Sequence, residues 1–317
     1  MKRVYLDQKD WINLSRANRG LKSGEPFTEA LRVARAAVSD GIVSFPLSEV
    51  HYMEVYRRRD WKSRHRLADL MAELSRFDTI APPQAVVPAE IDRALAVSFP
   101  DKTTPPPRPL KIFGSGLRHA AGDESMRFQI EPAEIPDEAT RRAFEAALSE
   151  EWELAMLRGP AVDTALPTPP VEYAYQQSEE TLSKRLEQDQ RGRGDRLRTA
   201  MIALGLVDIQ EPLVEALRRA GIALEDLLTL GEEGLTDLLR AVRSRWVLAA
   251  MRRDAHARKQ HEVNDLRDLA ALGIAAAYCD VVVTEKQWVH VLKQARIDAM
   301  MNTTLLSSVS QLPDALS

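Results

Sequence analysis

The chain has 317 residues, of which 44% are hydrophobic and 28% are charged, a balance typical of one or two folded globular domains. Its formal net charge of −4 and its pI near 6.0 give no overall signature of a nucleic-acid-binding protein, although basic residues can still gather on one surface. The single cysteine, Cys279, excludes an internal disulfide framework and a cysteine-based zinc cluster. No apolar stretch is long enough for a signal peptide or a membrane span, so we expect a cytoplasmic protein.

Strand-like and helix-like segments alternate over the first eighty residues. Short apolar runs predict buried strands at residues 4–6, 42–45 and about 78–80. Helical sequence lies between them, at about residues 9–18, 28–38 and 48–77, and Thr28 and Ser48 are the expected N-cap residues of the second and third helices. Strands that alternate with helices in this way predict a parallel α/β sheet.

The middle of the chain loses this alternation. A proline-rich segment, FPDKTTPPPRPLK, is a candidate linker, and helical periodicity dominates from about residue 131 to residue 261. A helix, a strand at residues 281–283 and a polar turn then restore the α/β pattern. We therefore expect one α/β domain built from residues 1–95 and 262–317, with a large, mostly α-helical insertion at residues 96–261.

Carboxylates follow the predicted strands. Asp7 comes directly after the first strand, Glu49 and Glu54 lie in the helix after the second, and Glu285 follows the last strand. Ligands of parallel sheets bind outside the carboxyl ends of the strands, so these acids are predicted to lie at one edge. Asp280 precedes the last strand, and about 16 Å of extended chain separates it from Glu285, which leaves Asp280 a structural role.

Two further acids, Asp265 and Asp268, lie on the helix before the last strand at i, i+3 spacing and so share one face. Carboxylates that converge on one point repel each other unless a hard cation neutralises them. Such a cation can activate water and stabilise a leaving oxygen in phosphodiester cleavage. The sequence therefore predicts a metal-assisted hydrolase, and it contains no glycine-rich phosphate loop or zinc-protease histidine pair that would favour another chemistry.

Three segments, VYLDQKDWINL, FPLSEVHYMEV and DLAALGIAAAYCDVVVTEK, resemble the PIN-domain nucleases in content and order. The resemblance covers roughly residues 1–95 and 262–300. It implies a PIN-like parallel sheet flanked by helices and an endoribonuclease that uses Mg²⁺ or Mn²⁺ to cleave single-stranded RNA. Free-standing members often act as toxins or in defence, and the helical insertion could then form a lid, a dimer interface or a docking surface for an inhibitor protein. No antitoxin element is visible in the sequence.

The resemblance also assigns roles to the acids. It implies that Asp7, Glu54, Asp268 and Glu285 are the catalytic metal ligands. Glu49 is the alternative to Glu54 as the second acid. At the fourth position, which is Glu285 in this chain, the family more often has aspartate. The glutamate side chain is one methylene longer, and this bears more on the binding of a second metal ion than on the binding of the first. Asp265 lies close enough to Asp268 to assist as a ligand.

Each acid also has a structural explanation that the sequence leaves open. Asp7 could cap the following helix, Glu54 could pair with Arg58 at i+4, and Glu285 could pair with Lys286. In the same way, Asp265 could be an N-cap residue and Asp268 could be a solvated acid of the first helical turn. His51 could be a packed core residue.

Two basic segments, at residues 57–66 and 240–260, could guide a phosphate backbone. In the first, which starts near Glu54, the predicted nucleic-acid contacts are Arg57, Arg58, Lys62 and Arg64. The alternative is that each segment is the solvated side of an amphipathic helix. Two other functions stay open: a PIN-like scaffold that binds proteins without catalysis, and a DNA nuclease of the flap-endonuclease kind.

Overall fold

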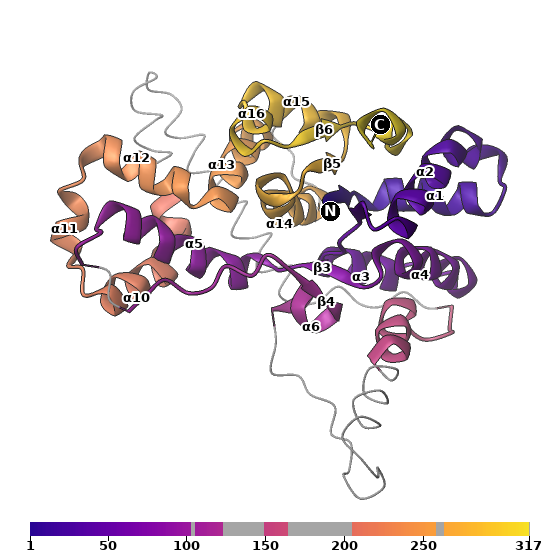
Figure 1. Cartoon of the computed structure of the whole chain (residues 1–317), viewed down its shortest axis with the longest axis horizontal. Coiled ribbons are helices and arrows are strands. Elements are labelled where there is room, and N and C mark those ends of the chain that lie inside the picture. The colour runs from indigo at the N-terminus through magenta and orange to yellow at the C-terminus, as the bar shows by residue number, and fades with distance from the viewer. Residues whose placement is uncertain (103–104, 123–148, 164–204, 258–262, 317) are drawn as a thin grey trace, which may run out of the picture.

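A four-stranded parallel sheet lies at the centre of the computed structural model, which describes residues 1–102, 105–122, 149–163, 205–257 and 263–316 (Figure 1). The strand order is β2-β1-β5-β6, and every neighbouring pair is parallel. The two ends of the chain therefore build one sheet, as the sequence predicted. The strands are β1 (Lys2–Leu6), β2 (Val43–Ser44), β5 (Val281–Val283) and β6 (Thr304–Leu306).

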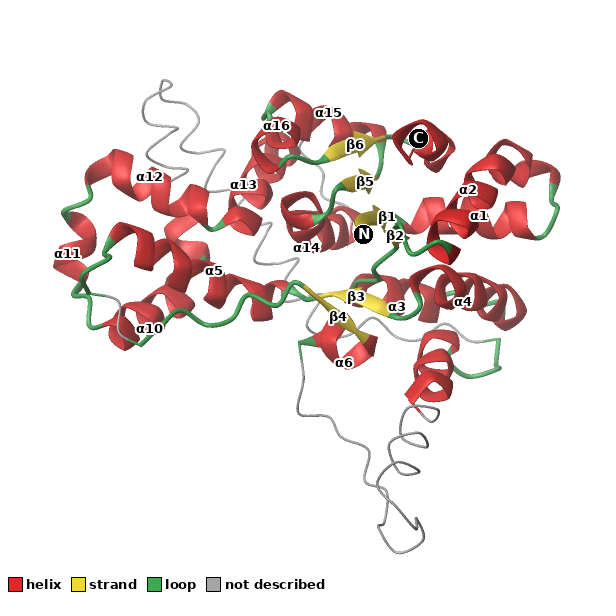
Figure 2. Ribbon diagram, viewed as in Figure 1, coloured by secondary structure: helices red, strands yellow, loops and turns green. Residues whose placement is uncertain are grey.

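Both faces of the sheet are buried by helices, which explains why its strands are almost continuously apolar (Figure 2). Successive side chains of a strand point to opposite faces, so Val4 and Leu6 enter one core while Tyr5 enters the other. The first core is covered by α1 (Gln8–Asn18), α2 (Thr28–Ser39), α4 (Trp61–Ser75) and α17 (Leu312–Leu316), and the second by α13 (Arg243–Ala257), α14 (Val263–Tyr278), α15 (Lys286–Gln294) and α16 (Ile297–Met301).

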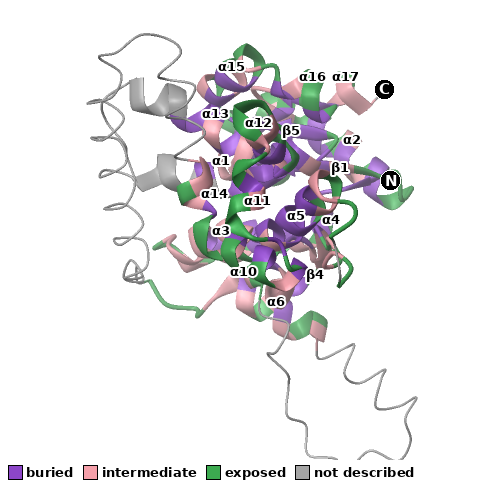
Figure 3. Ribbon diagram, turned by 90° about the vertical axis from the view of Figure 1, so that its left-hand side faces the viewer, coloured by how far each residue is buried: buried purple, intermediate pink, exposed green. Residues whose placement is uncertain are grey.

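Buried residues follow the strands and the helices that cover them (Figure 3). A third apolar cluster lies apart from the sheet, where α5 (Pro83–Ser98) packs against α10 (Gln210–Ala220), α11 (Leu224–Leu228) and α12 (Gly231–Ala241). Helix α5 crosses the predicted boundary at residue 96, because its own apolar side supplies part of this third core. The insertion is thus joined to the α/β domain by a continuous helix.

The single helix expected over residues 48–77 is two helices, and that prediction is wrong. Helix α3 (Glu49–Tyr56) starts after Ser48, as predicted, but it ends before α4 begins at Trp61. The side chain of Asp60 accepts a hydrogen bond from the backbone of Lys62, so an N-cap that the periodicity does not reveal starts a new helix.

Three further details differ from the prediction. Thr28 is the first residue of α2, and the N-cap position is occupied by Phe27. The predicted third strand exists as β3 (Asp78–Ile80), but it pairs antiparallel with β4 (Phe113–Ser115) in a separate two-stranded sheet. Strands β4 and β6 were not predicted, because each is only three residues long and lacks a run of strongly apolar residues.

The remaining described elements are short. Residues 149–158 are helical, and Leu157 within them is buried in the same core as Val4. No described helix is long and apolar enough to cross a bilayer. The short elements are the 3₁₀ helices η1 (Lys22–Phe27) and η3 (Val309–Gln311) and the helix α6 (Gly116–Ala121).

Candidate functional site

The carboxyl ends of three adjacent strands meet at one edge of the sheet. Leu6 of β1 is in register with Val283 of β5, and Val283 with Leu306 of β6. The backbone N–H of Asp7 donates to the carbonyl of Val283 (2.9 Å), which continues the ladder by one residue. Asp7 and Thr284 are therefore the first residues beyond the two central strands, as the sequence predicted.

Asp7 carries a half-buried carboxylate at this edge. Burial raises the pKa of Asp7, and the negative charge of Glu285 raises it further, whereas the ammonium group of Lys9 opposes both effects. Thr284 Oγ1 donates a long hydrogen bond to Asp7 Oδ2 (3.4 Å). Although Asp7 is the N-cap residue of α1, its carboxylate makes no capping hydrogen bond to that helix. Helix capping thus does not explain why this strand ends in an acid.

Glu285 is exposed and lies at the N-cap position of α15. Its Oε2 accepts a hydrogen bond from Gln287 Nε2 (3.0 Å), and its charge acts on Asp7 across the two strand ends. Asp7 and Glu285 are the pair of predicted site residues that the described side chains bring together.

The first turn of α3 is fastened to the end of β1 by His51. Its Nε2 donates to the carbonyl of Leu6 (2.8 Å), and its Nδ1 accepts from the backbone N–H of Ser48 (2.9 Å). Both ring nitrogens are thereby occupied in the neutral form, and burial lowers the pKa of His51 to about 4. His51 is a packed core residue, as expected. Glu54 follows it by three residues and so shares its side of the helix, toward β1.

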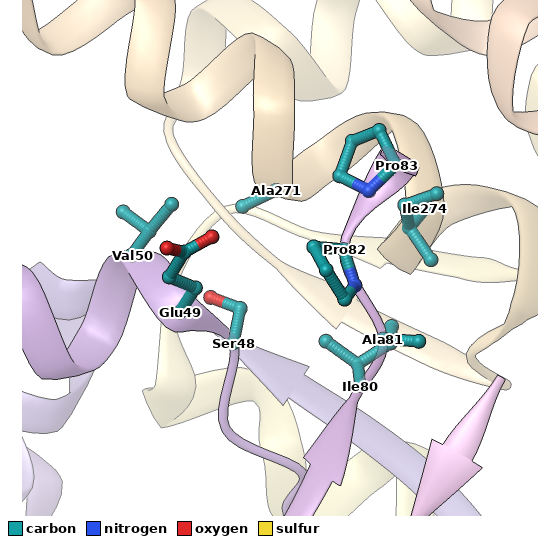
Figure 4. A pocket seen from close by; sticks show the side chains of 9 residues that line it. All are labelled: Ser48, Glu49, Val50, Ile80, Ala81, Pro82, Pro83, Ala271 and Ile274. Atoms are coloured by element: carbon teal, nitrogen blue, oxygen red, sulfur yellow. The ribbon is translucent and has the colours of Figure 1, made fainter. Parts of the chain in front are cut away.

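Glu49 lies in a different environment from Glu54. It lines an apolar cavity of about 40 Å³, and Figure 4 shows its side chain on the opposite wall from two prolines. Burial raises the pKa of Glu49. The cavity is bounded by Ser48, Glu49, Val50, Ile80, Ala81, Pro82, Pro83, Ala271 and Ile274. Glu49 thus faces this cavity, whereas Glu54 shares the side of His51, and the choice between them as the second acid stays a prediction.

Asp265 and Asp268 belong to the first two turns of α14, and their side chains lie outside the described residues. Asp268 precedes Ala271, which packs beside Glu49 in the cavity wall, by one helical turn. Among the side chains that the structure does describe, no three acidic, histidine or cysteine residues form a group that could hold a metal. A four-carboxylate site therefore stays a prediction.

The sequence reasoning missed Lys9 as a residue of this edge. Its Nζ donates to the backbone carbonyls of Thr284 (2.8 Å) and Ser307 (3.2 Å), which follow β5 and β6. The neighbouring Asp10 is buried in the first turn of α1, and its Oδ1 accepts from the backbone N–H of Val309 (2.8 Å). The sequence signal that could have indicated Lys9 is its position. It lies two residues beyond Asp7, where a new helix turns back over the ends of the strands.

Asp280 has the structural role predicted for it, at the amino end of β5. Its Oδ2 accepts from the backbone N–H of Arg3 (2.6 Å).

The four residues predicted to contact nucleic acid lie in different environments. Arg64 is only 1% exposed, and its guanidinium donates to backbone carbonyls that include those of Arg158 (2.8 Å) and Val162 (3.2 Å). It therefore holds the chain together and does not present its charge to a phosphate. Lys62 is exposed beside the Trp61 ring, whereas Arg57 and Arg58 are half-buried at the end of α3.

No protein-family model matches the chain, and neither the curated proteins nor the solved structures searched gave a match.

Proposed function

We propose that the chain is a metal-dependent endoribonuclease of the PIN-like type that cleaves single-stranded RNA. The observation that carries the proposal is that Asp7 and Glu285 follow the paired carboxyl ends of the two central strands, where the charge of Glu285 adds to the burial that raises the pKa of Asp7. Parallel sheets bind ligands at this edge. A half-buried acid held beside a second acid is typical of a site built for a cation.

The residues present fit Mg²⁺ or Mn²⁺. Magnesium is usually bound by one or two protein carboxylates together with water and substrate phosphates, so a dense protein cage is not required. Asp7 and Glu285 would supply the two carboxylates. A bound cation would offset both the cost of burying the Asp7 charge and its repulsion by Glu285, the two effects that raise the pKa of Asp7. Glu54 and Asp268 would complete the set, with Asp265 assisting.

The described side chains have distinct tasks in this proposal. Asp7 is directed by β1 and by the hydroxyl of Thr284, and Glu285 by the start of α15. His51 keeps the Glu54 side of α3 against the end of β1. Arg57, Arg58 and Lys62 would contact RNA phosphates without reading sequence. When bound, the cation would neutralise phosphate charge and activate a water for phosphodiester hydrolysis.

Cleavage of single-stranded RNA by the purified chain with Mn²⁺ tests the proposal. Asp7→Asn should lower the rate by at least about 100-fold, since even supporting residues of metal sites contribute about 10- to 100-fold. Asp280→Asn is the matched control, because it makes the same change at the opposite edge of the sheet, and it should keep the activity. The proposal fails if the wild-type chain and Asp7→Asn cleave RNA equally, or if neither does.

The assay also separates the remaining alternatives. Glu54→Gln should reduce cleavage strongly, whereas Glu49→Gln, the same change in the same helix, should leave most of it. Single-stranded DNA supplied beside RNA distinguishes a flap-endonuclease-like enzyme, which would cut the DNA. A protein-binding scaffold would cut neither substrate at any concentration of Mn²⁺ or Mg²⁺.

A further inference from the structure

The apolar cavity beside Glu49 lies where α3, β3, α5 and α14 meet (Figure 4). Ser48 and Glu49 lie at the start of α3, Ile80 is the last residue of β3, and two prolines lie at the start of α5. Ala271 and Ile274 belong to α14. The cavity volume of about 40 Å³ has room for about three water molecules, since each needs about 10–15 Å³ of such volume. A small ligand can therefore be held there.

The cavity has a buried apolar floor and a partly exposed mouth. Ile80 and Ile274 are each only 2% exposed, and they form the floor. Glu49, Val50 and Pro83 line the same cavity, yet each of them is partly open to solvent. A ligand can therefore enter beside Glu49, and its inner end would contact only hydrocarbon.

The Glu49 carboxylate is the polar group of the cavity wall with the capacity to bind a ligand. The hydroxyl of Ser48, the other polar side chain of the wall, lies within hydrogen-bond distance of His51 Nδ1 (3.3 Å). Among the described residues, none donates a hydrogen bond to the Glu49 carboxylate or pairs with it, and burial raises its pKa. The amino end of α3 favours a negative charge, but it leaves the carboxylate oxygens without donors. A cation at the mouth would compensate this half-buried charge.

We infer that this cavity binds a primary alkylammonium ion, with its ammonium group on Glu49 and its alkyl tail against Ile80 and Ile274. The carboxylate selects for positive charge, because hydrogen bonds between ionised partners are about twice as strong as those between neutral ones. The apolar walls select for a hydrocarbon tail. Three water molecules occupy about 90 Å³ of liquid, which limits the tail to about three or four carbon atoms.

The same arrangement discriminates against a diamine. The second ammonium group of 1,4-diaminobutane would be carried to the floor of the cavity, where the described side chains offer it no acceptor. Burying a charge without a partner is costly, so the diamine should bind more weakly than a monoamine of the same length. The inference is independent of the proposed nuclease function, because it involves neither RNA nor a metal ion.

Titration of the full chain with n-butylammonium, followed by methyl NMR in the presence of EDTA, tests the inference. Val50, Ile80 and Ile274 supply methyl groups on the cavity wall, and we expect their signals to shift with a dissociation constant of about 1 mM, a modest affinity for so small a ligand. 1-Butanol and butyrate have the same length without the positive charge. They should bind at least about 10-fold more weakly, as should 1,4-diaminobutane.

Two variants with the same change in the same helix separate recognition by Glu49 from a general effect of charge. Glu49→Gln should weaken n-butylammonium binding by at least about 10-fold and leave 1-butanol binding unchanged, because the cavity itself remains. Glu54→Gln is the matched control. It removes an acid that does not line the cavity, and it should bind n-butylammonium as the wild-type chain does.

Several results would overturn the inference. One is the absence of a shift in the Ile80 and Ile274 methyl signals at about 10 mM n-butylammonium, ten times the expected dissociation constant. Others are equal binding of n-butylammonium and 1-butanol, equal binding of the diamine, or equal binding by folded Glu49→Gln. An equal loss in Glu54→Gln would place the ammonium group elsewhere. Since RNA cleavage is not measured, a chain without nuclease activity leaves these outcomes unchanged.

Discussion

The acidic residues at the two edges of the central sheet lie in opposite environments. At the amino edge, Asp280 accepts the backbone N–H of Arg3, and Asp78 pairs with the Arg3 guanidinium (2.7 Å) and accepts from the hydroxyl of Ser44. At the carboxyl edge, Asp7 and Glu285 follow the paired ends of β1 and β5, and the negative charge of Glu285 raises the pKa of Asp7, whose Oδ2 accepts a long hydrogen bond from the hydroxyl of Thr284 (3.4 Å).

This difference shows how carboxylates of the same chain divide into structural and functional groups. An acid whose oxygens are filled by an arginine or by backbone N–H groups stabilises the fold and has little capacity left for a ligand. An acid that is half-buried beside another acid is costly to the fold until a cation arrives. Three experiments test this division.

The largest expected effect is on metal-dependent stability. A ligand that binds only the folded state at 100 times its dissociation constant stabilises it by about 2.7 kcal/mol. Mn²⁺ at that excess should therefore raise the free energy of unfolding of the wild-type chain and of Asp280→Asn, and should have little effect on Asp7→Asn. Thermal unfolding with Mn²⁺ and with EDTA measures this. An equal gain for Asp7→Asn would place the cation elsewhere.

The next largest effect is a loss of stability expected from a variant at the amino edge of the sheet. Asp78→Ala would leave the Arg3 guanidinium and the Ser44 hydroxyl without their carboxylate, and should lower the free energy of unfolding by about 1–3 kcal/mol. Urea unfolding measures the loss. RNA cleavage at a temperature where the variant is folded should be unchanged. A cleavage defect in the folded variant would show that the edges are not independent.

The smallest effect, counted per pH unit, concerns His51. The pKa of His51 falls from 6.5 to about 4 on folding, so between these values the unfolded chain binds a proton that the folded chain does not. Its contribution therefore makes the chain more stable as pH rises from about 4 to 6.5, by up to about 1.4 kcal/mol per pH unit.

His51→Gln removes this titration. The difference in unfolding free energy between the wild-type chain and His51→Gln should grow with pH over that window and stay constant above it. A difference that does not change with pH would mean that His51 is not held neutral at the end of β1.

The sequence was sufficient to predict that strands from both ends of the chain form one parallel sheet. Apolar runs with helices between them indicate parallel strands, even when the strands lie far apart in the chain. It was insufficient for β4 and β6, whose three residues pair through backbone hydrogen bonds and carry little hydrophobic pattern. The break between α3 and α4 was hidden because charged residues continue through it, and only the capping contact of Asp60 marks the new start.

For the site, the strand-end rule placed Asp7 beside Glu285, since strand pairing is determined by the fold. Helical spacing could not show that His51 is fastened to the carbonyl of Leu6 while Glu49, two residues before it, faces an apolar cavity, because both depend on tertiary packing. The sequence reasoning missed Lys9 and wrongly predicted that Arg64 contacts nucleic acid, for a common reason: both donate to carbonyls of segments far away in the sequence, and the residue type does not reveal such contacts.

The pairing of β1 with β5 has a consequence for synthesis on the ribosome. Val4 pairs with Val281, so β1 gains this partner only after the segment that contains β5 has been translated. Contacts of such sequence separation form slowly, because the loop-closure entropy must be overcome first. A nascent or prematurely terminated chain cannot bring Glu285 to Asp7. An activity that depends on both acids would therefore require synthesis to have passed Glu285.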